Sequence, residues 1–131
     1  MLEADVKRNM IKAMKDRGGY GRRIEDQYGV GIVDTVLIPR GLPVFFAEVK
    51  IVRAATFGPT PRQWVELQRI TEAAEEKPHA IPILIGYKVE SKTYYFHKPQ
   101  VVVTCQECFS VTTSDMDFYD QLVQYYHSRR K

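Results

Sequence analysis

The chain of 131 residues lacks any long hydrophobic run: no apolar stretch approaches the roughly 20 residues that a membrane-spanning helix requires. Its first residues also lack the basic and then apolar pattern of a signal peptide, because Glu3 and Asp5 carry negative charge there. We therefore expect a cytoplasmic protein with no membrane partner.

Cysteine is scarce, and Cys105 and Cys108 alone do not indicate a disulfide framework. Their spacing resembles half of a zinc site, but such a site normally has four ligands, and the histidines His79, His97 and His127 are scattered. These histidines also have no serine or cysteine partner that would favour nucleophilic hydrolase chemistry. We expect two ordinary thiols.

A strong excess of one charge is also missing, since 19 Lys and Arg residues face 16 Asp and Glu residues. This balance permits a nucleic-acid partner without requiring one. The basic residues are nevertheless clustered, which suits phosphate contacts and salt-dependent binding, although each cluster fits a solvated helix face equally well. The clusters are Lys7 with Arg8, Lys12, Lys15 with Arg17, Arg22 with Arg23, and residues 129–131.

Internal repeats and low-complexity linkers are absent as well. A length of 131 residues with 44% hydrophobic residues suffices for one domain with its own core. We expect a single domain over residues 1–131.

Apolar periodicity and turn signals predict an α/β (α+β) fold. Thr60, Pro61 and Gln63 mark a helix start with a capping box, and Ser114 would cap the last helix. The main elements follow the order α-β-β-β-α-β-β-α, with one further short strand before the last helix, and imply a mixed sheet with helices on its faces. We expect helices over about residues 2–16, 61–77 and 114–129, and strands over about 22–27, 32–38, 44–50, 81–87, 93–97 and 101–104.

The strands at residues 32–38 and 44–50 form a predicted hairpin that carries charges among apolar residues. If the hairpin is symmetric about Gly41, Asp34 lies opposite Glu48, with Cβ atoms roughly 4.5–5.5 Å apart. Facing carboxylates repel each other and lose hydration, so a shared proton or a cation must offset them. Lys50 points the same way as Glu48, because side chains alternate along a strand. The pattern therefore predicts a cation site.

Mg²⁺ suits this site because it prefers hard oxygen ligands and is commonly held by carboxylates together with substrate phosphates. We expect Mn²⁺ to substitute. The ion would neutralise phosphate charge and lower the pKa of a bound water, while Lys50 would orient that water or help to deprotonate it. This chemistry is phosphodiester hydrolysis. The alternative is a surface hairpin with solvated charges, which the apolar residues on both faces disfavour.

The pattern of Asp34, a turn and then Glu48-Val49-Lys50 resembles the signature of the PD-(D/E)XK nuclease superfamily. Within it, the chain is most similar to the VRR-NUC group, whose small stand-alone phage and bacterial forms resemble Holliday-junction resolvases. The resemblance extends from Glu3 to about residue 87. It implies a restriction-endonuclease-like core, Mg²⁺-dependent DNA cleavage and, for a phage protein, action in the host cytoplasm.

The resemblance also assigns roles by position. In such enzymes the strand acids and the carbonyl between acid and lysine bind metal, a first-helix glutamate assists, and a helix glutamine lies near the metal or the phosphate. The metal positions here are Asp34, Glu48, Val49 and Glu3, and the catalytic positions are Asp34, Glu48, Lys50 and Gln63.

Some positions depart from the family or have a second interpretation. Val33 stands where the family usually has proline, and the spacing from Lys50 to Gln63 is long. Glu3 equally suits the first turn of a helix, and Gln63 equally suits a capping box.

Several basic residues are candidate DNA contacts. Residues 54–59 are expected to form a mobile, substrate-facing loop, and the arginines on either side of it could grip phosphate with their planar guanidinium groups. The candidates are Arg53, Arg62, Lys7, Arg22 and Arg23.

These observations predict a metal-dependent endonuclease acting on structured or branched DNA, with Holliday junctions among its candidate substrates. Coordinated cutting of two strands needs two active sites, so we expect a homodimer. The last helix, with Phe118, Leu122, Tyr125 and Tyr126, is the candidate interface. Two alternatives remain open: a nucleic-acid-binding module that no longer cuts, and a structural subunit of a larger complex.

Overall fold

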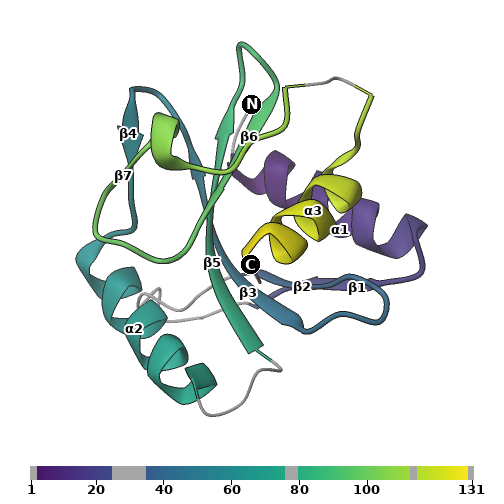
Figure 1. Cartoon of the computed structure of the whole chain (residues 1–131), viewed down its shortest axis with the longest axis horizontal. Helices are drawn as coiled ribbons and strands as arrows, with labels where there is room; N and C mark the ends of the chain where they lie inside the picture. The colour runs from purple at the N-terminus through teal and green to yellow at the C-terminus, as the bar shows by residue number, and fades with distance from the viewer. Residues whose placement is uncertain (1–2, 25–34, 76–79, 113–114, 130–131) are drawn as a thin grey trace.

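A computed structural model describes residues 3–24, 35–75, 80–112 and 115–129 of the chain (Figure 1). It contains a five-stranded sheet in the order β1-β2-β3-β5-β6. Strands β3 and β5 are parallel, and the other neighbours are antiparallel. The predicted mixed sheet flanked by helices is confirmed. Its strands are β1 Tyr20–Arg23, β2 Thr35–Ile38, β3 Val44–Ile51, β5 Ala80–Lys88 and β6 Thr93–His97.

Helices cover both faces of this sheet (Figure 1). Helices α1 (Glu3–Asp16) and α3 (Phe118–Arg129) lie together on one face, and α2 (Pro61–Glu75) lies against β5 on the other. Met10 and Met14 are fully buried, so the apolar stripe of α1 faces the sheet. In the described part of the chain, no helix is both long and apolar enough to cross a membrane.

The central strand β3 separates the two faces of the sheet. Every second residue of this strand is fully buried in the core that also includes residues of α1 and α3, namely Phe45, Ala47 and Val49. Glu48 and Lys50 therefore point to the opposite face, because successive side chains of a strand alternate. We call this the α2 face.

A small second sheet lies beside the main one. Strand β4 (Thr56–Phe57) pairs antiparallel with β7 (Val103–Thr104), and the short 3₁₀ helix η1 (Cys105–Glu107) follows. The strand expected over residues 101–104 is therefore shorter and lies outside the main sheet. Its partner β4 comes from the segment after β3, a pairing that depends on tertiary contacts.

Packing between the two sheets overturns the expectation that residues 54–59 form only a substrate-facing loop. Phe57 is 8% exposed and packs with Val52 and Leu84 in a second apolar cluster. Gly86 allows this approach, because a Cβ there would lie 2.6 Å from Val52 Cγ2 and 2.7 Å from Phe57 Cζ. The segment is therefore held by the core on one side.

The two later helices begin differently from one another. Helix α2 begins as predicted, since Thr60 N donates to Gln63 Oε1 at 2.9 Å and Gln63 N donates to Thr60 Oγ1 at 3.3 Å. Helix α3 begins later than expected, with Asp117 at its start accepting at Oδ1 from Asp120 N at 2.9 Å. Ser114, the predicted cap, lies outside the described residues.

The residues of α3 predicted to form a dimer interface belong largely to the core of the same chain. Phe118, Leu122 and Tyr125 are 5%, 0% and 7% exposed. Phe118 and Tyr125 stack on Phe96 of β6, with ring centroids 5.9 and 5.6 Å away. The expectation was wrong for these three residues, and of the four predicted residues Tyr126 alone is not buried.

Candidate active site

Strands β2 and β3 pair in the register expected for a hairpin symmetric about Gly41. Thr35 pairs with Ala47, and Leu37 pairs with Phe45. Each pair is equidistant from Gly41 along the chain, so the predicted register is confirmed for the described part of the hairpin.

Glu48 lies in the middle of β3, and its side chain is 1% exposed. Leu84 of β5 is its neighbour in the parallel ladder. Burying a carboxylate is costly unless the group is paired, so an apolar strand retains one only with compensating contacts. Asp34, the predicted partner across the hairpin, lies outside the described residues, and its contact with Glu48 stays a prediction.

Lys50 shares the α2 face with Glu48. Its Nζ lies 3.8 Å from Glu48 Oε1, and its side chain is 18% exposed. Its ladder neighbour is Gly86. The lysine side chain is therefore partly open to solvent while the carboxylate is enclosed, an arrangement that can present a positive charge to an anionic substrate.

The described residues supply donors of the kind that Mg²⁺ prefers. Glu48 offers a carboxylate, whereas Val49, whose side chain is fully buried in the core, could contribute only its main-chain carbonyl. Within the described residues, no cluster of three or more His, Cys, Asp or Glu side chains could hold a metal by itself. These hard oxygen donors fit Mg²⁺ in type, with Asp34 as the further donor predicted from the sequence.

Two other predicted site residues lie on different helices. Gln63 is at the start of α2, where its Oε1 is occupied by the capping hydrogen bond from Thr60, leaving the amide nitrogen to donate elsewhere. Glu3 is half-buried in the first turn of α1, the helix on the face opposite Glu48. The metal role of Glu3 and the catalytic role of Gln63 stay predictions.

Lys7 does not lie on an exposed surface, as a direct DNA contact would require. Lys7 is only 6% exposed and lies on the same side of α1 as Met10 and Met14. This follows from helix geometry, because residues three and seven positions apart share a face. We therefore remove Lys7 from the candidate phosphate contacts.

Other basic residues of the predicted clusters are held in ion pairs on the surface. Arg8 pairs with Asp5 at 3.2 Å, and Lys12 pairs with Asp16 at 2.6 Å. By contrast, all four arginines predicted to contact DNA are exposed and form no hydrogen bond or ion pair with the described residues. They are Arg22 and Arg23 in β1, Arg53 after β3, and Arg62 at the start of α2.

The two cysteines are free thiols around η1. Cys108 Sγ donates to Thr104 O at 3.3 Å, and burial raises the pKa of the Cys108 thiol to about 12. The thiol is therefore protonated at neutral pH. Sequence reasoning missed the turn that holds it, although the pattern of Thr104 and Glu107 is a capping box and both of its hydrogen bonds are present.

Sequence reasoning also missed a contact between the end of α1 and the start of α3. Arg17 lies 3.1 Å from Asp117 and 3.0 Å from Asp120, and its guanidinium lies 4.6 Å from the centre of the Tyr119 ring. No local signal indicates this contact, because its partners are about a hundred residues apart in the chain.

Comparison with known proteins supports the fold. The chain is similar to Hjc, a Holliday junction resolvase from the archaeal hyperthermophile Archaeoglobus fulgidus, with 12% sequence identity and a TM-score of 0.58. The match covers 83% of this chain and 91% of that chain. The likeness concerns the fold. The predicted restriction-endonuclease-like α/β class is confirmed, whereas no protein-family profile and no curated protein sequence matches the chain.

Proposed function

We propose that this protein is a metal-dependent endonuclease that hydrolyses phosphodiester bonds in structured or branched DNA. The observation that carries the proposal is the pairing of a buried carboxylate, Glu48, with a solvent-reachable ammonium, Lys50, on one face of the central strand. The fold likeness to a Holliday junction resolvase supports four-way junctions as one candidate substrate.

Each residue of the site has a proposed task. The carboxylate of Glu48 and the carbonyl of Val49 would hold Mg²⁺ or Mn²⁺ together with Asp34. The family resemblance adds Glu3, which could assist only from the end of α1, because that helix covers the opposite face of the sheet. When bound, the ion would neutralise charge on the scissile phosphate and lower the pKa of a water molecule. Lys50 would orient the attacking water and offset the negative charge that develops on the phosphate.

Substrate binding is assigned to exposed arginines. Arg53 follows β3, and Arg62 is the second residue of α2, the helix that covers the face of the sheet carrying Glu48. Arg22 and Arg23 lie on β1, at the edge of the sheet. Planar guanidinium groups suit bidentate phosphate contacts, so these residues would hold the DNA backbone near the site.

Two finer statements belong to the same proposal. We propose membership of the VRR-NUC group, supported by the sequence motif of Asp34, Glu48 and Lys50. A homodimer would place two active sites on one branched substrate, as coordinated cutting of two strands requires.

The test is cleavage of labelled four-way junction, flap, single-stranded and linear duplex DNA with Mg²⁺, Mn²⁺ or EDTA. Glu48→Gln and Lys50→Ala should abolish cutting without changing the folded state. Glu90→Gln and Lys88→Ala are matched controls, because they make the same changes at exposed positions on and after β5. These controls should cut like the wild type.

The outcomes separate the candidate functions. Metal-dependent cutting that is lost only in the site variants supports the nuclease, and paired symmetric nicks on the junction identify a resolvase. Intact DNA binding without cutting of any substrate would point to a non-catalytic module. Absence of both binding and cutting would point to a structural subunit.

A further inference from the structure

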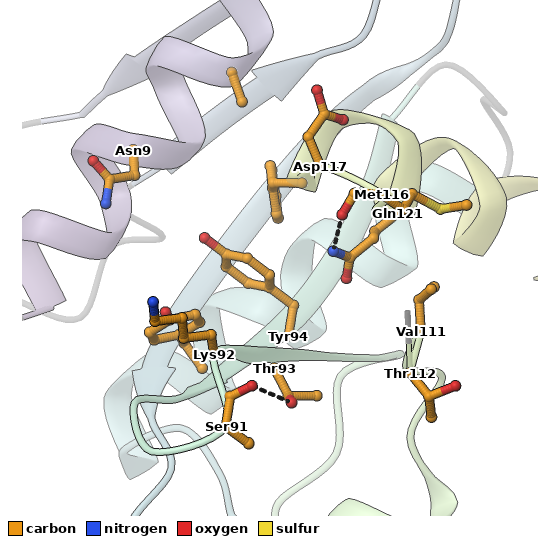
Figure 2. A pocket seen from close by; sticks show the side chains of 13 residues that line it. Asn9, Ser91, Lys92, Thr93, Tyr94, Val111, Thr112, Met116, Asp117 and Gln121 are labelled. Carbon is orange, nitrogen blue, oxygen red and sulfur yellow. Dashed lines mark hydrogen bonds between the residues drawn. The ribbon is translucent and has the colours of Figure 1, made fainter. Parts of the chain in front are cut away.

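A pocket of about 450 Å³ lies on the face of the sheet opposite Glu48 (Figure 2). Its walls come from α1, from the turn between β5 and β6, from residues 111–112 and from the start of α3. Pockets that bind small molecules typically measure about 300–1,000 Å³. None of the lining residues has a place in the proposed nuclease site, so the pocket needs its own explanation.

One wall of the pocket holds a buried amide with an unused acceptor. Gln121 is 7% exposed, and its Nε2 donates to Met116 O at 2.9 Å. Its Oε1 is buried and accepts no hydrogen bond from the described residues. Figure 2 shows this oxygen on the side of the amide away from Met116, and Gln121 is among the residues that line the pocket. An unmet buried acceptor costs about 1–3 kcal/mol, so a donor entering here would be favoured.

Aromatic rings form the neighbouring wall. The ring of Tyr94 lies 4.7 Å from that of Tyr87 and 4.8 Å from that of Phe118, centre to centre. Burial raises the pKa of the Tyr94 phenol, so at neutral pH the group is protonated and able to donate a hydrogen bond. These surfaces suit a flat, largely apolar group that also carries polar edges.

A positive charge stands at the tip of the turn between β5 and β6. Lys92 is exposed, lines the pocket and forms no ion pair with the described residues. Its φ of 51° is left-handed, as is common for a residue that closes a hairpin turn, and Lys92 N donates to Val89 O at 3.3 Å across that turn. The acid on the opposite wall, Asp117, is already paired with Arg17 at 3.1 Å. The net charge offered to a ligand is therefore positive.

We propose that this pocket binds a nucleotide, with the nucleobase against the Tyr94 ring, a base N–H donating to Gln121 Oε1, and the phosphate at Lys92. The pocket offers an aromatic surface to a planar group, an acceptor to a hydrogen-bond donor and a positive charge to an anion. A nucleotide carries all three groups in one molecule. The choice of a nucleotide among such anions rests on the proposed nuclease function. The nucleotide could come from an unpaired position of branched DNA or from free mononucleotide.

The test measures binding of deoxynucleoside monophosphates and of short single-stranded oligonucleotides by calorimetry in EDTA, on the Glu48→Gln background so that no DNA is cut. Gln121→Met removes the acceptor while keeping an unbranched side chain, and should weaken binding about tenfold. Lys92→Asn removes the charge at a residue type that tolerates left-handed φ. Lys88→Asn is the matched control, because Lys88 is exposed on β5 and does not line the pocket.

Each outcome decides the proposal. Weaker binding in both pocket variants, with the control unchanged, supports it; binding of oligonucleotides but not monophosphates assigns the source to DNA. No binding of either ligand, or equal affinity in all variants, overturns it. DNA cleavage without nucleotide binding would overturn the pocket assignment but would still support the proposed nuclease function. Pocket-dependent binding without any cleavage would support the pocket assignment and contradict the nuclease function. Lys92→Asn keeps the test valid if Gln121→Met fails to fold, because Lys92 is outside the core.

Discussion

Lys50 Nζ lies 3.8 Å from Glu48 Oε1, and the carboxylate is 1% exposed while the lysine side chain is 18% exposed. The pair should contribute more to the unfolding free energy than its separation alone suggests, because burial weakens the screening of charges by water. In a double-mutant cycle of unfolding free energy with Glu48→Gln and Lys50→Met, we expect a coupling of about 0.5–3 kcal/mol.

The pair Lys12 and Asp16 is the reference for that cycle. Its Nζ–Oδ2 distance is shorter, 2.6 Å, but its side chains are 73% and 58% exposed. Exposed pairs one helical turn apart contribute only about 0.3–0.5 kcal/mol. Equal coupling in the two cycles would show that enclosure does not strengthen the contact between Glu48 and Lys50.

Gly86 sets the distance between the main sheet and the small sheet. Gly86→Ala would place a Cβ 2.6 Å from Val52 Cγ2, so we expect a loss of about 1–3 kcal/mol in unfolding free energy from overpacking. Val52→Ala removes one of the two side chains that the new Cβ meets, whereas the Phe57 ring, with Cζ 2.7 Å away, remains. Denaturant unfolding should therefore show that Val52→Ala costs less in the Gly86→Ala background than alone, and strictly additive costs would contradict the proposed clash.

The contact of Arg17 with the start of α3 predicts a dependence of stability on pH. The hydrogen bond from Arg17 to Asp120 holds the pKa of this carboxyl below its usual value. Its stabilising effect is therefore present above the unfolded-state pKa and is lost as the pH falls through the lower folded-state pKa. Arg17→Met should lower the Tm at pH 7 and change it little in strong acid.

The control for Arg17 is Arg8→Met, which removes an exposed contact within α1 and joins no separate elements. It should lower the Tm less than Arg17→Met at pH 7. A loss in Arg17→Met that is as large in strong acid as at neutral pH would mean that packing on Tyr119, and not the ion pair, is the source of the stabilisation.

The exposed arginines predict a salt-dependent interaction with DNA. Arg53→Ala and Arg62→Ala should each weaken binding of all DNA forms and reduce the slope of log affinity against log salt by about one unit or less. Lys12→Ala is a control, because Lys12 is paired with Asp16. Fluorescence anisotropy over a salt series measures both quantities, and an unchanged slope in the arginine variants would exclude phosphate contacts there.

Local patterns predicted the parts of the structure that depend on neighbouring residues. The capping box of Thr60 and Gln63 needs only a spacing of three positions, and it is present. The register of the hairpin around Gly41 follows from one short turn, and it is confirmed where the structure describes it. The burial of Lys7 follows from its spacing to Met10, which places both residues on the side of α1 that faces the sheet.

Contacts between distant segments could not be read in this way. The sequence does not show that β4 pairs with β7, that Arg17 reaches α3, or that Phe118 fills the core of its own chain. Such contacts depend on how elements far apart in the chain pack, and the same apolar side chain serves equally well in a core or in an interface.

The sequence by itself determined the local elements, the hairpin and the acid-x-lysine motif, because these depend on short-range backbone geometry and on side-chain alternation along a strand. Only the tertiary structure decided that Glu48 is enclosed while Lys50 reaches solvent, and that a pocket forms behind the sheet. Burial is set by what packs against a residue from elsewhere in the chain, and that packing is a property of the whole fold.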